Sequence, residues 1–187
     1  HLYNWYDTGT LAVLDGGYVS TVDSGNLAAC LLTCREGFAR YGAAFLSRRA
    51  GALLDAMDFA PFYDSSRHLF HIGWDGRTKK LTQGWYDLMS SEARLMSYFA
   101  VARGDVPCRH WRQLSRAAAR TCGYRCMVRW TGPVFEYLMP ELFLPLCPDS
   151  LLWETARACL RAQRAHAPRG RPWGRSESAF HAFTPDG

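Results

Sequence analysis

The sequence contains no run of about 18 uncharged apolar residues, which is the length a helix needs to cross a membrane. It also contains no signal peptide, and its first residue is histidine rather than methionine. We therefore expect that this segment does not itself cross a membrane, whether or not a longer protein that contains it does.

No stretch of the sequence repeats at a fixed period, which argues against a regular solenoid. No nucleic-acid-binding motif is present either, although the net charge is +5. Much of that charge is local, in arginines at positions 157, 161, 164, 169, 171 and 175. The first three have the spacing of one helix face, and a solvated face is the commoner origin of such a run. We expect no nucleic-acid partner.

The seven cysteines include no C-x2-C pair, which is the usual spacing of a zinc knuckle. Two pairs are four residues apart, Cys30/Cys34 and Cys122/Cys126, so a helix could present either pair to one metal ion. We favour reduced thiols that act as small core hydrophobes. No metal and no cofactor are expected.

The composition is that of a globular protein. Hydrophobic residues make up 48% of the 187 residues, charged residues 21% and aromatic residues 14%. This length suffices for one domain with a substantial core, and not comfortably for two. An excess of Trp and Tyr often marks a binding surface as well as a core, because their polar groups need partners when buried.

Apolar residues recur at helical spacing in six segments, which predicts helices over residues 22–42, 43–57, 90–104, 109–120, 133–144 and 148–170. The N-caps expected for three of them are Asp23 or Ser24, Ser90 or Ser91, and Asp149 or Ser150. Arg94 and Arg103 are expected on the sides of the third helix that face away from its apolar stripe.

Other segments have the pattern of strands or loops. Phe70 and Ile72 alternate with polar or small neighbours, and Asp75-Gly76 is a hairpin turn signal. Residues 126–132 are expected to form a strand or a turn, and residues 1–20 an irregular, aromatic-rich loop. The sequence therefore predicts a mainly α fold with a minor β-hairpin.

Three glutamates are candidate catalytic groups. Glu92 is expected in the first turn of its helix, where the helix dipole stabilises a negative charge; this suits a nucleophile and a capping residue equally. Glu136, between two aromatic residues, has a raised pKa and suits a general acid if it is buried, or else lies on a polar helix face. Glu177 follows Pro172 and Trp173 in a stiffened loop, where it is either a catalytic acid or a solvated charge.

Two loops have the composition of a sugar site. Trp5 and Asp7 lie in NWYDT, and Asp23 and Asn26 lie in TVDSGN. An aromatic ring can stack on the apolar face of a pyranose while short polar groups bind its hydroxyls. Capping and Asx turns are the alternative roles of these residues.

Eight separated motifs occur in an order that resembles the glycoamylase-like domain of bacterial cyclic β-1,2-glucan synthases: YNWYDT, YVSTVDSGNLA, MDFAPFYD, LFHIGW, YDLMSSEARLMSYFAVARGDVP, HW, FEYLMP and PWGRSESAF. The resemblance covers essentially the whole chain. It implies an (α/α)6 toroid, of which residues 1–187 would be the central portion, with both ends of the barrel missing. Such a fragment leaves apolar helix faces uncovered, so we expect it to be inactive in isolation.

The resemblance also implies an activity. The family's domain cleaves linear β-1,2-glucan and joins the ends into a ring, next to a membrane-embedded glycosyltransferase domain and a phosphorylase-like domain. It therefore implies a place on the cytoplasmic side of the bacterial inner membrane. An endo-β-1,2-glucanase is one alternative, because water and a sugar hydroxyl can occupy the same acceptor position. A non-catalytic or degenerate glucan-binding module is another, suggested by the divergent segment over 115–130.

The family's site residues transfer to this sequence by motif. The resemblance implies Glu92 as nucleophile and Glu177 as acid/base, with Glu136 as a supporting carboxylate of the cleft. It implies sugar contacts at Trp5, Asp7, Asp23, Asn26 and Trp173.

Overall fold

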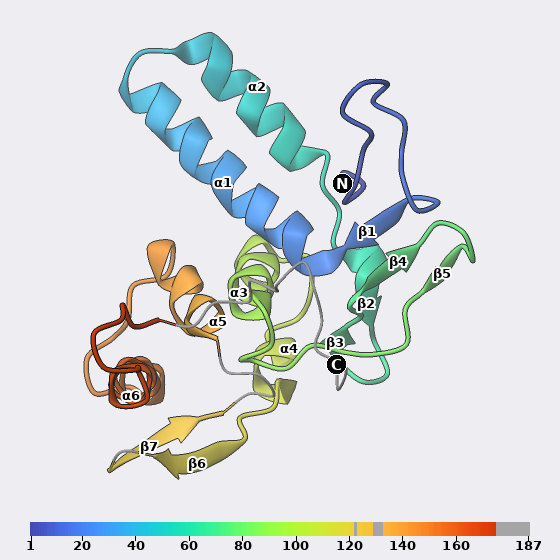
Figure 1. The fold of residues 1–187 in the computed structure, drawn as a ribbon. Coiled ribbons are helices and arrows are strands. Elements are labelled where there is room, and N and C mark those ends of the chain that lie inside the picture. Colours follow the sequence, from blue (N-terminus) through green and yellow to red (C-terminus); the bar gives the residue numbers. More distant parts are fainter. Residues whose placement is uncertain (122, 129–132, 175–187) are drawn as a thin grey trace. The chain divides into compact units, whose positions relative to one another are not determined.

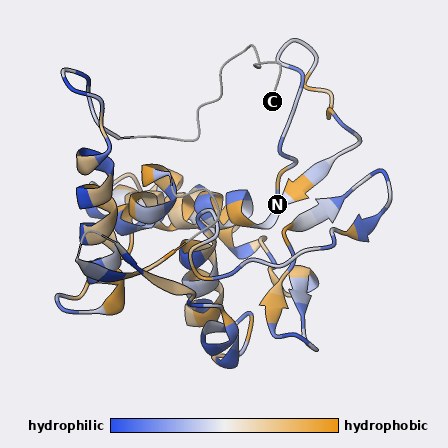
Figure 2. Cartoon of the chain, turned by 60° about the horizontal axis from the view of Figure 1, so that its bottom comes forward, coloured by the Kyte–Doolittle hydropathy of each residue, from blue (hydrophilic) through white to orange (hydrophobic). Residues whose placement is uncertain are grey.

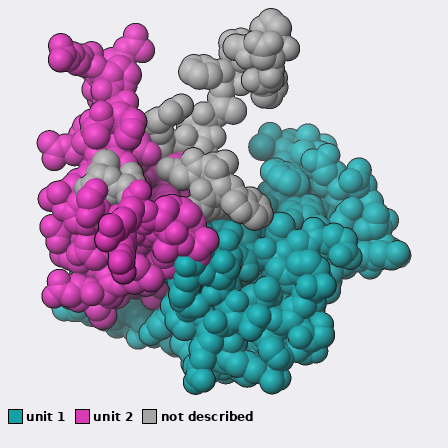
Figure 3. Space-filling model, turned by 90° about the horizontal axis from the view of Figure 1, so that it is seen from below, with its two compact units in different colours: residues 1–116 teal, residues 117–187 magenta. Residues whose placement is uncertain are grey.

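The computed structural model describes residues 1–121, 123–128 and 133–174. The chain forms two compact units, residues 1–116 and residues 117–187 (Figure 3). Within the described ranges, the regular structure consists of six α-helices, two short 3-10 helices and three small antiparallel sheets. The predictions of a mainly α fold and of a minor β element are confirmed at this level.

The first unit is built on a helical hairpin (Figure 1). Its two antiparallel helices are α1 (Thr21–Arg40) and α2 (Ala44–Asp55). Ser20 is the N-cap of α1, and its hydroxyl accepts a hydrogen bond from the Asp23 N–H at 3.2 Å. The predicted caps, Asp23 and Ser24, are therefore wrong, because the preceding serine already satisfies a free N–H group of the first turn.

A glycine brings α3 (Ala93–Arg103) close to α1. A Cβ atom at Gly25 would overlap Cβ and Cγ of Met96, so the two helices approach too closely there for any larger residue. Met96 is fully buried. The core around this contact consists of Val19, Ala28, Leu54, Met57, Phe59, Phe62, Phe70, Met96, Phe99, Ala100 and Val106.

Arg103 connects the end of α3 to the end of α2. Its guanidinium forms a 2.8 Å salt bridge with Asp105 and donates hydrogen bonds to the carbonyl oxygens of Leu54 and Met57. It also lies over the ring of Phe59, 5.6 Å from the centroid. The charge is therefore compensated, and it satisfies carbonyl groups that the end of α2 leaves open.

Two small sheets complete the first unit. The strands of the larger sheet, in spatial order, are β1 (Tyr18–Ser20), β4 (Gly73–Asp75) and β5 (Lys80–Leu81). After a 3-10 helix over Ala60–Phe62, β2 (Tyr63–Asp64) pairs with β3 (Leu69–Phe70). The hairpin predicted at Asp75-Gly76 is confirmed as β4 and β5. The first twenty residues are not wholly irregular as predicted, because they contain β1.

His110 is buried in the first unit, in the short helix α4 (Arg109–Gln113). Its Nδ1 lies 2.8 Å from the carbonyl oxygen of His68, and its Nε2 lies 2.9 Å from Ser97 Oγ. Because a carbonyl can only accept, Nδ1 carries the proton and Nε2 accepts from the Ser97 hydroxyl. Burial lowers the pKa of His110. The neutral imidazole thus joins three segments of the core.

The helix predicted over 109–120 is wrong in its second half. The guanidinium of Arg116 donates to the carbonyl oxygens of Trp111 and Leu114, at 2.7 Å and 2.6 Å, and so satisfies the end of α4. The second unit then begins with a hairpin of β6 (Ala118–Thr121) and β7 (Tyr124–Met127). The strand or turn expected over 126–132 is confirmed for the two residues that β7 covers.

The remaining elements of the second unit are α5 (Val134–Leu138), a 3-10 helix over Met139–Leu142, and α6 (Leu151–Ala165). The single helix predicted over 133–144 is wrong, because Pro140 has no N–H to continue the α-helical pattern. Ser150 caps α6, one of its two predicted caps, and its hydroxyl accepts from the Trp153 N–H at 3.2 Å.

Helix α6 has a buried face and a charged face. Figure 2 shows the same mixture of hydrophilic and hydrophobic residues along the helices in general. On the buried face, Thr155 Oγ1 accepts a hydrogen bond from the Met127 N–H at 2.9 Å. On the charged face, Arg157 and Arg161 are exposed and lie over the ring of Tyr124, 5.6 Å and 4.6 Å from its centroid. This agrees with the prediction of a solvated helix face.

The thiols of Cys30, Cys34, Cys108, Cys147 and Cys159 are free, as predicted. Only Cys126 and Cys159 are buried, and burial raises the pKa of Cys159 to about 11. The prediction of core positions is wrong for Cys30, Cys34, Cys108 and Cys147, which are exposed. Cys122 lies outside the described residues.

The Gly25 contact predicts a difference between two glycines of α1. We expect Gly25→Ala to destabilise the chain by about 1–3 kcal/mol, because the new methyl group overpacks the contact with α3. Gly37→Ala is the matched control, because a Cβ at Gly37 meets no atom within 4 Å. It should stabilise the helix by about 0.5–1 kcal/mol. Urea unfolding midpoints of the two variants measure both effects, and equal effects would contradict the close helix contact.

The buried neutral His110 predicts a dependence of stability on pH. Its folded pKa is lowered from an unfolded value of about 6.5, so the unfolded state binds the proton more tightly. The stability that the neutral imidazole contributes is complete above about pH 6.5 and is lost as the pH falls toward the folded pKa. The difference in unfolding midpoint between the parent chain and His110→Gln should therefore shrink below pH 6.5. A difference that stays constant between pH 8 and pH 5 would contradict a buried neutral imidazole.

Candidate active site

Glu92 occupies the N-cap position of α3 and is buried, with 6% of its surface exposed. Its side chain forms no capping hydrogen bond. Ser90 and Ser91, the predicted caps, are wrong, because Ser90 Oγ donates to Asp87 Oδ1 at 2.7 Å and Ser91 Oγ to Glu92 Oε2 at 2.8 Å. The capping role considered for Glu92 is therefore not supported.

The backbone before Glu92 is strained. Ser91 has a φ of 48°, in the left-handed region that non-glycine residues rarely adopt. Such strain costs roughly 1–2 kcal/mol and persists only where the surrounding structure imposes it. Here it turns the chain sharply between the buried Ser90 and the buried Glu92. Strained residues cluster at functional sites, and this one precedes the predicted nucleophile.

Arg94 is also buried, with 3% of its surface exposed, and the prediction of an outward position for it is wrong. One of its guanidinium nitrogens lies 3.9 Å from Met89 Sδ. A carboxylate and a guanidinium are thus buried within one turn of the same helix. Burying charged groups is costly unless they are compensated. No local pattern of the sequence predicts this arrangement, because it depends on how the residues around α3 pack.

Tyr86 brings Glu92 and the start of α1 into one region. Burial raises the pKa of Tyr86, and the charges of Tyr18, Asp23 and Glu92 raise it further. A hydrogen bond with the Ser20 side chain opposes part of this shift. The phenol therefore stays protonated at neutral pH and can donate a hydrogen bond. The sequence analysis did not predict a role for Tyr86, because most of the residues that act on it lie more than 60 positions away in the sequence.

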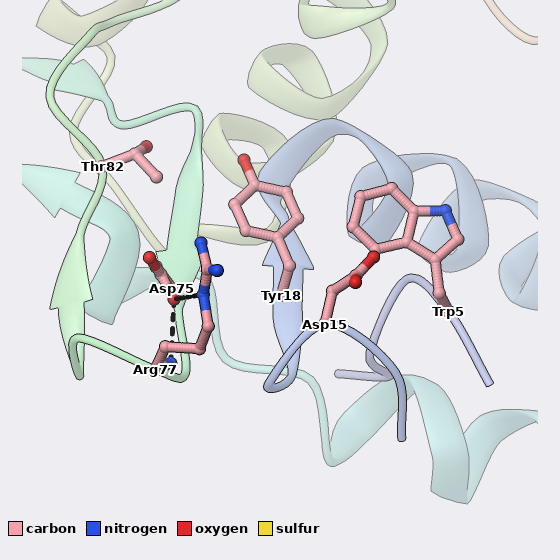
Figure 4. A pocket seen from close by; sticks show the side chains of 6 residues that line it. All are labelled: Trp5, Asp15, Tyr18, Asp75, Arg77 and Thr82. Carbon is pink, nitrogen blue, oxygen red and sulfur yellow. Dashed lines mark hydrogen bonds and ion pairs between the residues drawn. The ribbon is translucent and has the colours of Figure 1, made fainter. Parts of the chain in front are cut away.

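A cavity of about 440 Å³ opens beside β1 and β4. It is lined by Trp5, Asp15, Tyr18, Asp75, Arg77 and Thr82 (Figure 4). The indole of Trp5 and the ring of Tyr18 are stacked, with centroids 5.8 Å apart and planes at 21°. The cavity thus combines an aromatic wall with carboxylate, guanidinium and hydroxyl groups, the composition expected of a site for a polar ligand with apolar faces.

The predicted sugar contacts at the start of the chain have different environments. Trp5 lines the cavity, whereas Asp7 does not. Asp7 accepts hydrogen bonds from Gly9 and Thr10, which lower its pKa, so it has the Asx-turn role that was the alternative. Asp23 accepts a hydrogen bond from the Asn4 side chain. The side-chain oxygen of Asn26 is buried and has no hydrogen-bond partner among the described residues.

The other predicted site residues belong to the second unit. Glu136 is buried in α5, with 4% of its surface exposed, so it does not lie on a polar helix face. Trp173 is 48% exposed. Glu177 lies outside the described residues, so its distance from Glu92 stays a prediction of the motifs.

The described residues contain neither a cluster of metal ligands nor a membrane-spanning helix. Over residues 1–121, 123–128 and 133–174, no three His, Cys, Asp or Glu side chains are grouped so that they could hold a metal ion. No helix in this part of the chain has the length and apolar character needed to span a bilayer.

The chain is similar to the cyclic beta-(1,2)-glucan synthase NdvB of Rhizobium meliloti (strain 1021). The two are 35% identical over 178 residues, which cover 90% of this chain and 6% of that protein. The chain thus spans a small part of the length of this relative. No family model matches the chain. The comparison supports the interpretation of the chain as a segment related to a glucan synthase, which the ordered motifs indicated.

The strain at Ser91 predicts a difference between two substitutions that both remove its hydroxyl. Glycine adopts a φ of 48° without penalty, whereas alanine does not. We therefore expect Ser91→Gly to be more stable than Ser91→Ala by about 1 kcal/mol. Thermal unfolding of the two variants measures the difference. A more stable alanine variant would contradict the left-handed backbone next to Glu92.

Proposed function

We propose that the chain is part of a glycoamylase-like domain that acts on β-1,2-glucan and cyclises linear chains by retaining transglycosylation. The observation that carries this proposal is the 35% identity over 178 residues to a protein named as a cyclic beta-(1,2)-glucan synthase. The buried carboxylate of Glu92, held after a strained residue, adds a group suited to the chemistry.

In this proposal Glu92 and Glu177 divide the reaction into two displacements. The Glu92 carboxylate attacks the anomeric carbon of a glucosyl unit while Glu177 protonates the oxygen of the leaving chain. The bond between that carbon and the leaving oxygen breaks, and a glycosyl ester of Glu92 forms. Glu177 then takes the proton from a hydroxyl at the other end of the same glucan, and that oxygen displaces Glu92. The product is a ring, and both carboxyl groups return to their starting states.

The surroundings of Glu92 suit a transferase. A glycosyl intermediate must be kept from water until the sugar hydroxyl arrives. Glu92 is 6% exposed, and its carboxylate accepts a hydrogen bond from the Ser91 hydroxyl at 2.8 Å. This burial limits the access of bulk water to the carboxylate. Glu136 is proposed as a supporting carboxylate of the same cleft.

The proposal also includes a larger assembly. The helical hairpin of α1 and α2 is the kind of unit from which an (α/α)6 toroid is built. Because the match covers 6% of NdvB, we propose further domains in the complete protein. By the resemblance, these are a membrane-embedded glycosyltransferase and a phosphorylase-like domain, which would place this segment on the cytoplasmic side of the inner membrane.

The carboxylate pair predicts the effect of two conservative substitutions in the complete protein. Glu92→Gln and Glu177→Gln should each lower the rate of ring formation from linear β-1,2-glucan by at least about 100-fold, because a nucleophile or an acid/base is lost. Chromatography and mass spectrometry of the products measure the rate and distinguish rings from linear chains.

Glu36→Gln is the matched control for these variants. Glu36 is an exposed glutamate of α1 that forms a salt bridge with its neighbour Arg35, and its removal should leave the rate within about twofold. Ring formation at the parent rate in both site variants would refute the carboxylate pair. If the parent protein releases only short linear chains, the segment is a hydrolase, and the cyclising part of the proposal fails.

A further inference from the structure

Trp5 and Tyr18 form an aromatic platform on the surface of the first unit. Their rings are stacked at 5.8 Å, and Trp5 is 49% exposed. Figure 4 shows the two rings next to each other at the cavity, with the Asp75–Arg77 pair on the far side of Tyr18 from Trp5. An indole that is half exposed over another ring has one large apolar surface available for a ligand. Tryptophan side chains contribute much of the binding energy at many binding sites, so a half-exposed indole indicates a place for a ligand.

The backbone and neighbouring side chains fix this platform in place. A hairpin of the N-terminal segment holds Trp5, whose carbonyl oxygen accepts from the Leu14 N–H at 3.0 Å. Tyr18 lies on β1, and a Cβ at Gly73 would overlap its hydroxyl, so glycine at this position makes room for the phenol. The two rings are therefore held before a ligand arrives, which lowers the entropy cost of binding.

Polar groups surround the platform. Arg77 forms a 3.7 Å ion pair with Asp75, whose carboxylate also accepts from the Arg77 N–H at 2.8 Å. Asp15 lines the same cavity, and its carboxylate has no hydrogen-bond or ion-pair partner in the part of the chain that the structure describes. Its φ of 51° places it at a sharp turn before β1. A carboxylate and a guanidinium beside an apolar ring match a pyranose, which has C–H groups on its faces and hydroxyls at its edge.

The platform and Glu92 are separate groups of the first unit. Besides burial, the charges of Tyr18 and Glu92 raise the pKa of Tyr86, so both residues act on this phenol. The cavity of about 440 Å³ does not include Glu92 among its lining residues. A sugar unit in the cavity and a sugar unit at Glu92 would thus be different units of the glucan.

We propose that the Trp5–Tyr18 cavity is a subsite that binds a glucosyl unit of the β-1,2-glucan away from the bond that is cleaved. One face of the sugar stacks on Trp5, and its edge hydroxyls bind Asp15 and the Asp75–Arg77 pair. This inference rests on the proposed function. Because the sugar in this subsite does not react, its contacts are the same in the ground state and in the transition state. They hold the chain on the protein and leave the chemical step unchanged.

The test is Trp5→Ala in the complete protein, compared with Trp5→Phe and with Tyr41→Ala. Tyr41, 87% exposed at the end of α1, is an aromatic control outside the cavity. We expect Trp5→Ala to raise KM for linear β-1,2-glucan about tenfold, with kcat within about twofold. Trp5→Phe keeps an aromatic face and should stay within about threefold of the parent KM. Tyr41→Ala should match the parent.

A second measurement separates binding from turnover. In the Glu92→Gln background, calorimetry with linear β-1,2-glucan oligosaccharides should show about tenfold weaker binding when Trp5→Ala is added. Asp15→Asn should weaken binding about threefold, and asparagine tolerates the left-handed backbone of that position. If Trp5→Ala itself misfolds, the Asp15→Asn result decides.

The outcomes distinguish the subsite from the proposed function. Unchanged KM and affinity in the Trp5 and Asp15 variants, with loss of turnover in Glu92→Gln, would overturn the subsite and leave the proposed function standing. A fall in kcat at unchanged KM would also overturn it, because Trp5 would then act on the chemical step. A parent protein that neither binds nor converts the glucan would overturn both.

Discussion

The contact between Gly25 and Met96 sets the spacing of α1 and α3, and the rest of the first unit depends on it. The start of α1 carries Asp23 and is preceded by β1, while the start of α3 carries Glu92. A larger residue at this contact would push the two helices apart. Tyr86 interacts with Ser20 and with Glu92, and both interactions require the present spacing. The absence of a side chain at Gly25 thus determines how the candidate site is assembled.

The charged groups near the start of α3 add a second constraint. Glu92 and Arg94 are both buried, and a buried charge is stable only with close electrostatic compensation. The chain reaches this arrangement through the unfavourable backbone angle of Ser91. The region therefore holds local strain and buried charge, both of which lower stability. Their presence at one turn is easier to explain by a chemical role for Glu92 than by folding alone, and this agrees with the proposed nucleophile.

Much of the fold follows from periodicity, and the failures have identifiable causes. Helices α1, α2, α3 and α6 follow the apolar spacing of their segments, and the β4–β5 hairpin follows its Asp-Gly turn. The prediction that α4 continues to residue 120 was wrong, because the long side chain of Arg116 reaches back to carbonyl groups at the end of the helix. The local residue pattern does not encode such contacts. The caps of α1 and α3 were misplaced by one to four residues, because several serine and aspartate residues compete at each helix start.

The candidate site was predictable in part. The sequence indicated Glu92 and Trp5 through their motifs, but not the burial of Arg94, which depends on packing around α3. The cavity at Trp5 joins segments up to 77 residues apart, from Trp5 to Thr82, so no local motif could reveal it. Glu136 illustrates the same limit: its two interpretations differed only in burial, which a sequence does not determine.

The distribution of thiols gives the molecule a built-in reporter of local opening. Cys126 and Cys159 are buried in the second unit, where burial raises the pKa of Cys159 to about 11 and so leaves very little reactive thiolate. Cys30, Cys34 and Cys108 of the first unit are exposed, and so is Cys147 of the second unit. An alkylating reagent therefore modifies these four exposed thiols in the native state, but reaches Cys126 and Cys159 only when the packing of β7 against α6 opens. The rate of labelling at Cys126 and Cys159 therefore measures the stability of the second unit separately from that of the first.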